Sequence, residues 1–113
     1  MALTTGPNLG LLVDGTAGEE HYSALMAFLR GMDALIQPRV VDRDLAAPPG
    51  SPSDGALYIV AASPTGAWAG HATHLARWSS VISAWEFYVP KSGWRTYVID
   101  EAIYVSFNGT AWA

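Results

Sequence analysis

The sequence predicts an α+β fold, in which an N-terminal extended arm and one amphipathic helix precede a small antiparallel β-sheet or barrel-like module. Three observations predict it. An apolar seam with helical spacing occupies the first third of the chain, and short β-prone segments fill the second half. Between them lies a proline- and glycine-rich connector, residues 46–55. We therefore expect residues 1–45 to serve assembly or docking and residues 56–113 to form a tryptophan-rich β-module.

The composition narrows the classes of function. The chain has 113 residues, of which 50% are hydrophobic and 14% charged, so it is a single folded domain and not a disordered segment. It has no cysteine, which excludes disulfides and thiolate metal sites. The net charge of −4 and the scattered basic residues disfavour nucleic acid as a partner. No stretch approaches the ~20 apolar residues of a membrane span, and the N-terminus lacks the pattern of a signal peptide. We expect no membrane insertion.

The helix is predicted over residues 19–36. Glu19 and Glu20 place negative charge in the first turn, where the helix dipole favours it. Pro38 ends the helix because it has no amide hydrogen to donate. Large apolar residues follow a 3-4-3-4 spacing over about two heptads. This helix seam consists of Tyr22, Leu25, Leu29, Met32 and Ile36.

Two interpretations of the helix seam remain open. It packs either on the sheet of its own chain or against further copies of the chain, with a trimer favoured. The low charge density fits the second interpretation, since surfaces covered by a partner are poor in charged residues. Two heptads alone make a marginal coiled coil, so self-association must also use other surface.

The strands of the β-module are predicted from their β-prone residues and from the turns between them. The pair Asn108-Gly109 is a strong hairpin signal. Along one strand, Trp85 and Phe87 alternate with Glu86 and Tyr88, so the two pairs should lie on opposite faces. A short strand at 39–45 precedes the connector. The strands of the module are predicted over 56–62, 73–78, 82–89, 94–99, 103–107 and 110–112.

No arrangement of residues predicts catalysis. His71 and His74 would come together on a helix, but their flanks predict strand and loop, so we expect no metal site there. Asp100 and Glu101 would face opposite sides of a strand and would cooperate only in a turn. No serine lies in a nucleophile elbow, and no glycine-rich loop has the context of a phosphate site. We expect no enzymatic activity, no cofactor and no metal.

The aromatic residues of the second half have two interpretations. Most of the five tryptophans should fill the core, because a small sheet needs large side chains to cover it. One or two exposed rings would instead form a platform for sugar rings or for a partner protein. The candidates for such a platform are Trp68, Trp78, Trp94 and Tyr97.

A series of motifs in fixed order carries a family resemblance. They are Met32-Asp-Ala-Leu-Ile-Gln37, Asp42-Arg-Asp-Leu-Ala-Ala-Pro-Pro49, Ser51-Pro-Ser-Asp-Gly55, Tyr58-Ile-Val-Ala-Ala62, Thr65-Gly-Ala-Trp-Ala-Gly70, Trp85-Glu-Phe-Tyr-Val-Pro90, Gly93-Trp94, Asp100-Glu101 and Asn108-Gly-Thr-Ala-Trp112. In them, residues 29–113 resemble a domain-of-unknown-function family found in tail-fibre and tail-associated proteins of tailed bacteriophages and gene transfer agents. The segment Gly18-Glu-Glu-His-Tyr-Ser-Ala-Leu25 departs from the family's usual glutamine- and lysine-bearing segment.

The resemblance implies a location and an assembly, but no reaction. It implies a protein made in the bacterial cytoplasm that ends in the virion tail as a homo-oligomer. We therefore expect a structural tail-fibre or adaptor component of the tail or baseplate, bound to its own copies and to other tail or baseplate proteins. The alternative is a receptor- or glycan-binding module for host attachment, which contacts host surface sugars through exposed tryptophans.

Overall fold

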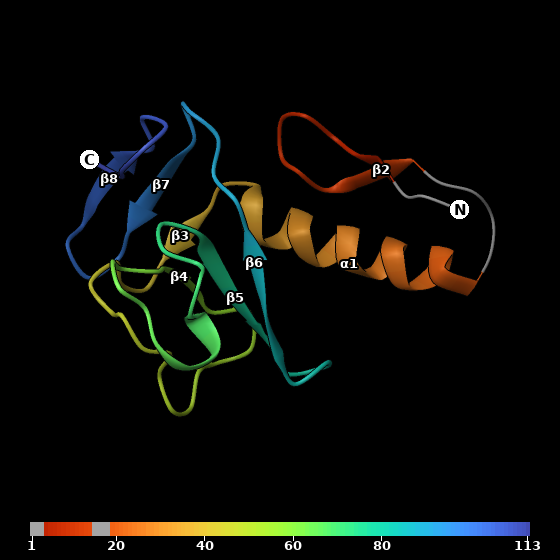
Figure 1. The fold of residues 1–113 in the computed structure, drawn as a ribbon, viewed down its shortest axis with the longest axis horizontal. Coiled ribbons are helices and arrows are strands. Elements are labelled where there is room, and N and C mark those ends of the chain that lie inside the picture. Colours follow the sequence, from red (N-terminus) through yellow and green to blue (C-terminus); the bar gives the residue numbers. More distant parts are fainter. Residues whose placement is uncertain (1–3, 15–18) are drawn as a thin grey trace.

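A computed structural model describes residues 4–14 and 19–113 (Figure 1). It has one α-helix and two small three-stranded sheets, which confirms the predicted α+β class; within these ranges the strands close no barrel. The elements are β1 (Thr4–Thr5), β2 (Leu12–Asp14), α1 (Glu19–Leu35), β3 (Arg39–Val40), β4 (Leu57–Ile59), the 3-10 helix η1 (Gly66–Trp68), β5 (Leu75–Ser79), β6 (Ala84–Tyr88), β7 (Arg95–Val98) and β8 (Ile103–Ser106).

The two three-stranded sheets differ in topology. The central sheet has the order β4-β5-β6 and is antiparallel throughout. The terminal sheet has the order β3-β7-β8, with β3 parallel and β8 antiparallel to β7. The parallel pair was not predicted, because turn signals report only strands that are neighbours in the sequence. Figure 1 shows α1 extending away from both sheets, with β2 alongside it. None of the described helices is long and apolar enough to cross a membrane.

The central sheet is covered on both faces. Tyr88 lies on the face toward the main core, and Trp85 and Phe87 pack on the other face, as the alternation predicted. The main core contains residues of the N-terminal loop between β1 and β2, of α1 and of both three-stranded sheets. It therefore joins segments from both sides of the predicted connector. Its buried members are Leu11, Ala34, Leu35, Val40, Leu57, Ile59, Leu75, Tyr88, Val98 and Val105.

A second, aromatic core lies on the other face of the central sheet. The loop between β4 and β5 folds over this face and places Trp68 there, with none of its surface exposed. The Trp68 ring lies 5.2 Å from Trp85 and 5.7 Å from Tyr58, between ring centroids, in edge-to-face or tilted geometry. Gly66 begins η1 at a φ of 64°, a conformation that favours glycine. The loop therefore covers the face of the central sheet that points away from the main core.

The helix is held to the central sheet by a network of four charged side chains. Arg30 donates two hydrogen bonds to Glu86, from Nε at 2.8 Å and from Nη2 at 3.0 Å. Buried Arg77 donates to Asp33 at 2.9 Å, and its Nη1 lies 3.9 Å from Glu86 Oε1. Arg30 and Asp33 belong to α1, whereas Arg77 and Glu86 are directly paired across β5 and β6. The charge network therefore fixes both the position of α1 and its rotation about its axis.

On its side away from the helix seam, α1 receives the N-terminal loop. A Cβ at Gly31 would overlap the Leu11 side chain, so the absence of a side chain lets Leu11 lie against the helix. The same loop is attached to the terminal sheet, because Trp94 Nε1 donates to the Asn8 carbonyl at 3.1 Å. The N-terminal loop therefore connects α1 to the segment that leads into β7.

We predict that Glu86→Ala lowers the free energy of unfolding by about 3 kcal/mol, because it leaves buried Arg77 beside an unpaired Arg30. Urea unfolding followed by circular dichroism measures the loss. The matched control is Glu101→Ala, which breaks the exposed bidentate pair with Arg43 and should cost much less, because solvent screens that pair. Equal losses in the two variants would contradict the anchoring role of the charge network.

Candidate functional site

The helix seam lies on an uncovered face of α1. Tyr22 is 69% exposed, Leu29 49% and Ile36 57%, and Leu25 is exposed as well. Only Met32 is partly buried, against the main core. The interpretation that the seam packs on its own sheet is therefore wrong for four of its five residues.

The small residues of α1 explain this orientation. Gly31 and Ala34 are buried on the side of the helix opposite the seam, and Leu35 joins them in the body. Small side chains let the N-terminal loop and the sheets approach closely, so the helix turns its large apolar side chains outward. The sequence pattern located the seam correctly, but it carried no information on which face the body would cover.

A hollow lies at the C-terminal end of α1. Its volume is about 350 Å³, and two exposed aliphatic side chains, Val41 and Ile99, stand at its edge beside the helix end. The remaining wall is mostly polar. The other lining residues are Asp33, Ala34, Gln37, Pro38, Arg39, Ser53, Asp54, Gly55, Ala56 and Leu57.

The predicted aromatic platform is not assembled. Trp68 is completely buried, so its assignment as a ligand-contacting ring is wrong. Trp78 is half-buried and lies 5.3 Å from Trp85, edge to face. Trp94 is half-buried against the main core, and Tyr97 lies apart from these rings on the terminal sheet. Trp68, Trp85, Trp94 and Trp112 pack in or against the two cores, which need large side chains to cover the small sheets.

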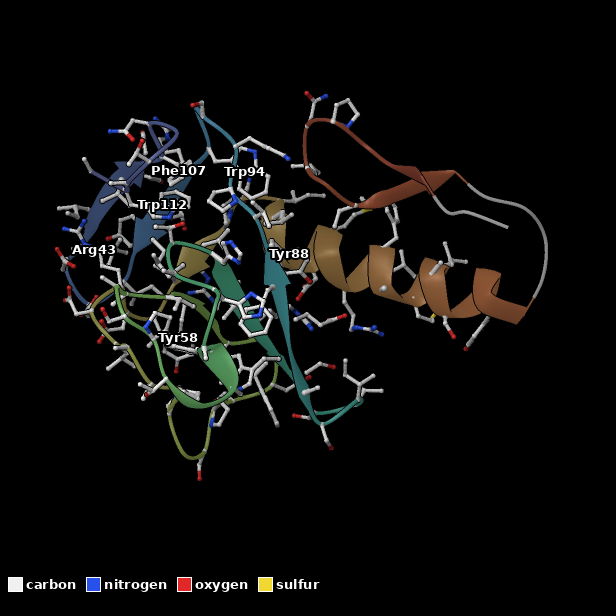
Figure 2. The ribbon with its side chains drawn as sticks, viewed as in Figure 1. Arg43, Tyr58, Tyr88, Trp94, Phe107 and Trp112 are labelled. Carbon is white, nitrogen blue, oxygen red and sulfur yellow. The ribbon has the colours of Figure 1, made fainter. Side chains whose placement is uncertain are left out.

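The aromatic residues near the C-terminus pack together at one end of the two three-stranded sheets. Figure 2 shows Trp94, Phe107 and Trp112 gathered there, with Tyr58 apart in the aromatic core. The Phe107 and Trp112 rings lie 5.3 Å apart, and Trp112 Nε1 donates to the Thr73 carbonyl at 2.8 Å. Between them the chain turns, with two backbone N–H groups donating to the Asn108 side chain. The predicted Asn108-Gly109 turn is confirmed, and its role is structural.

His71 and His74 form a close pair. Their Nδ1 atoms are 3.1 Å apart, and the His71 ring stacks on Phe87 at 3.6 Å between centroids. A turn brings them together, with Thr73 at a φ of 70°; the expectation that only a helix would join them was wrong. Burial lowers the pKa of His74, and His71 lowers it further. The geometry suits one shared proton, and within the described ranges no third histidine or carboxylate completes a metal site there.

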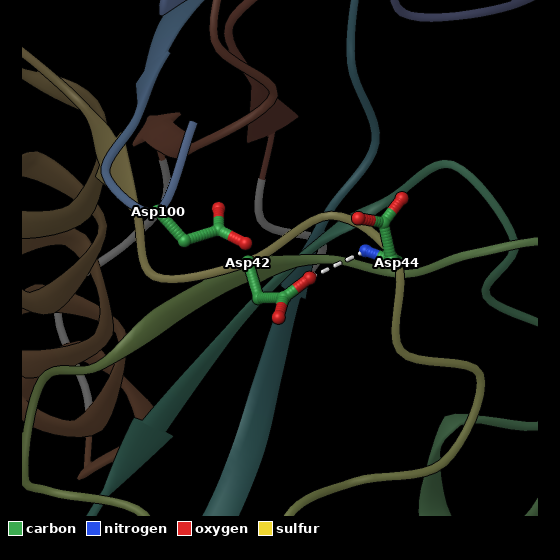
Figure 3. A group of neighbouring side chains, drawn as sticks. All are labelled: Asp42, Asp44 and Asp100. Atoms are coloured by element: carbon green, nitrogen blue, oxygen red, sulfur yellow. Dashed lines mark hydrogen bonds between the residues drawn. The ribbon is translucent and has the colours of Figure 1, made fainter. Parts of the chain in front are cut away.

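Three carboxylates meet at one edge of the terminal sheet. Possible ligand oxygens of Asp42, Asp44 and Asp100 all lie within 4.8 Å of one another. Figure 3 shows the Asp100 carboxylate pointing toward Asp42, whose own carboxylate turns toward Asp44 and accepts its backbone N–H at 2.7 Å. Partial desolvation raises the pKa of Asp100, and Asp42 raises it further. Such oxygens are the kind that Ca²⁺ and Mg²⁺ bind. The spacing of Asp42 and Asp44 was the one feature of the sequence that pointed to this cluster.

Glu101 takes no part in this cluster. Arg43 donates to both of its carboxylate oxygens, at 2.8 and 2.9 Å, which lowers the pKa of Glu101. Asp100 and Glu101 lie in the turn after β7, yet they face different partners. They are therefore not a pair that shares one proton for acid–base chemistry.

Comparison with known proteins places the chain in a family. Residues 27–113 match DUF2793, a family of proteins of unknown function. The chain belongs to this family. The matched part begins inside α1 and contains both three-stranded sheets, whereas Tyr22 and Leu25 of the helix seam precede it. No curated protein matches the chain.

We predict that acid weakens this DUF2793 chain partly through His74. Its pKa in the folded state lies below the unfolded value of about 6.5, so stability is full above that pH and falls as pH drops through the lower folded value. Urea unfolding midpoints measured between about pH 7 and pH 5 should decline less steeply for His74→Gln than for wild type. The same slope in both proteins would contradict the assignment.

Proposed function

We propose that this DUF2793 chain is a non-enzymatic structural component of a bacteriophage tail or baseplate. It assembles with copies of itself through the helix seam and docks to other tail or baseplate proteins. The observation that carries the assembly is the uncovered apolar face of α1. The tail location rests on the resemblance of residues 29–113 to tail-fibre and tail-associated proteins.

The size and continuity of the helix seam support an interface. Tyr22 and Ile36 are separated by fourteen positions, which at 1.5 Å per residue is about 21 Å of helix. Large apolar side chains exposed along this length are typical of a surface that a partner protein covers. The charged residues on the neighbouring faces, Arg30 and Asp33, are already paired within the charge network. Another copy can therefore approach the seam without leaving either charge unpaired.

A bundle of parallel helices fits the spacing of the seam. The 3-4 repeat places one apolar residue per turn on the same side, which is the pattern of left-handed helix packing. Two heptads hold such a bundle only marginally. A stable trimer therefore requires additional contact area outside both the helix seam and the hollow at the end of α1.

The direction of the helix suits an adaptor. Because α1 extends away from both sheets (Figure 1), several helices can associate while the sheets remain outside the bundle. The outer surfaces of the sheets are then available to neighbouring tail or baseplate proteins. The burial of Trp68 removes one of the rings on which a tryptophan-based glycan site depended.

We predict that Leu29→Glu converts the oligomer to single chains, because it places a charge in the middle of the apolar interface. Light scattering coupled to size exclusion, at micromolar concentration, should give three times the 12.1-kDa chain mass for wild type and one chain mass for the variant. Ser23→Glu is the control, since it adds the same charge at an exposed helix position outside the seam. A wild-type protein that runs as one chain, or equal dissociation of the two variants, would contradict self-assembly through the seam.

A further inference from the structure

The outer face of the terminal sheet carries a second exposed surface with a different chemistry. Two tyrosines and two arginines share this face, because the register pairs Arg39 with Tyr97 and Tyr97 with Tyr104, while Arg95 lies two residues before Tyr97. The intervening Thr96 and Val98 point into the protein and are buried. We call these four residues, Arg39, Arg95, Tyr97 and Tyr104, the tyrosine–arginine face.

The side chains of this face are ordered by one another. The Tyr97 and Tyr104 rings lie 5.1 Å apart between centroids at an angle of 66°. The Arg95 guanidinium carbon is 4.8 Å from the centre of the Tyr104 ring, a cation–π contact that holds the arginine along the sheet. Tyr104 is nevertheless 62% exposed. The face therefore presents preoriented rings and cations to the outside.

The two arginines keep their hydrogen-bonding capacity for a ligand. The chain has six basic residues, and Arg30, Arg43 and Arg77 are bound to carboxylates. Arg39 and Arg95 form no ion pair with another described residue. A guanidinium carries five N–H donors in a plane that matches a carboxylate with two parallel hydrogen bonds. In a protein of net charge −4, two such arginines on one sheet face mark a site for negatively charged groups.

The hollow beside this face adds partners for hydroxyl groups. Arg39 belongs both to the face and to the wall of the 350 Å³ hollow. The same wall contains the Gln37 amide, the Ser53 hydroxyl and the carboxylates of Asp33 and Asp54. Amides donate and accept hydrogen bonds, and carboxylates accept them, so this lining suits a ligand rich in hydroxyls.

We infer that the tyrosine–arginine face binds a glycan that carries carboxylate groups, such as a chain of uronic acid sugars. The apolar C–H face of a sugar ring packs on Tyr97 and Tyr104, and a carboxylate accepts hydrogen bonds from Arg95 or Arg39. Hydroxyls of the next sugar reach Gln37 and the aspartates of the hollow. This site lies on the terminal sheet and does not depend on assembly through the helix seam.

The surrounding charges select against other ligands. A nucleic acid presents phosphates to the arginines but few hydroxyl groups, so it would leave the polar groups of the hollow, among them Gln37 and Asp54, without hydroxyl partners. A neutral glycan would leave both arginines without an anionic partner. A ligand with both carboxylates and hydroxyls satisfies the arginines and the aspartates together.

We predict that the wild-type protein binds an oligogalacturonate and binds its carboxyl-reduced, neutral counterpart at least about tenfold more weakly. Isothermal titration calorimetry with each saccharide, and with a single-stranded oligonucleotide of similar length, measures the three affinities. Absence of oligogalacturonate binding overturns the proposal. So does equal affinity for the neutral saccharide, or tighter binding of the oligonucleotide.

Variants locate the site. Arg95→Ala and Tyr104→Ala should each weaken oligogalacturonate binding about tenfold, whereas Tyr104→Phe, which keeps the ring, should stay within about twofold. Lys91→Ala is the control for net charge, because it removes one exposed positive charge in the turn before β7. Circular dichroism verifies that each variant is folded. If Lys91→Ala weakens binding as much as Arg95→Ala, or if Tyr104→Ala has no effect, binding does not occur at this face.

Discussion

The charge network between α1 and the central sheet fixes the orientation of the helix. This orientation determines which side chains of α1 are exposed. Arg77 is buried in β5, and its cross-strand partner Glu86 is shared with Arg30 of the helix. Arg30 and Asp33 lie three residues apart, so their ion pairs hold one side of the helix to the sheet over a single turn. These ion pairs prevent rotation of α1 about its axis. The small residues of the helix are then held against the body, and the helix seam is held outward.

The two exposed surfaces follow from how the cores are filled. The central sheet is covered on both faces, and its aromatic core buries Trp68 and most of the surface of Trp85. The main core covers one face of the terminal sheet, and among the described residues the other face carries exposed arginines, exposed Tyr104 and half-buried Tyr97. Apolar surface remains on α1 and amphipathic surface on the terminal sheet. We propose that other copies of the chain bind the apolar surface of α1 and that an acidic glycan binds the terminal sheet.

Local patterns in the sequence predicted the elements, and long-range contacts decided the rest. The 3-4 spacing and Pro38 located the helix, and Asn108-Gly109 located the final turn, since each acts within a few residues. The parallel pairing of β3 with β7, the burial of Trp68 and the meeting of Asp42 with Asp100 join segments far apart in the chain. The His71–His74 pair was missed for another reason. A turn with Thr73 at positive φ, which a non-glycine residue rarely adopts, brings the two rings together.

The most direct test of the account is oxidative cross-linking of single cysteines, because the chain has none of its own. A cysteine at Leu29, in the middle of the outward seam, should form a disulfide with the same position of another copy under mild oxidation. A cysteine at Ser51, which is exposed in the connector, should remain reduced under the same conditions. Equal cross-linking at both positions, or none at Leu29, would contradict a helix whose anchored rotation turns its apolar face toward other copies of the chain.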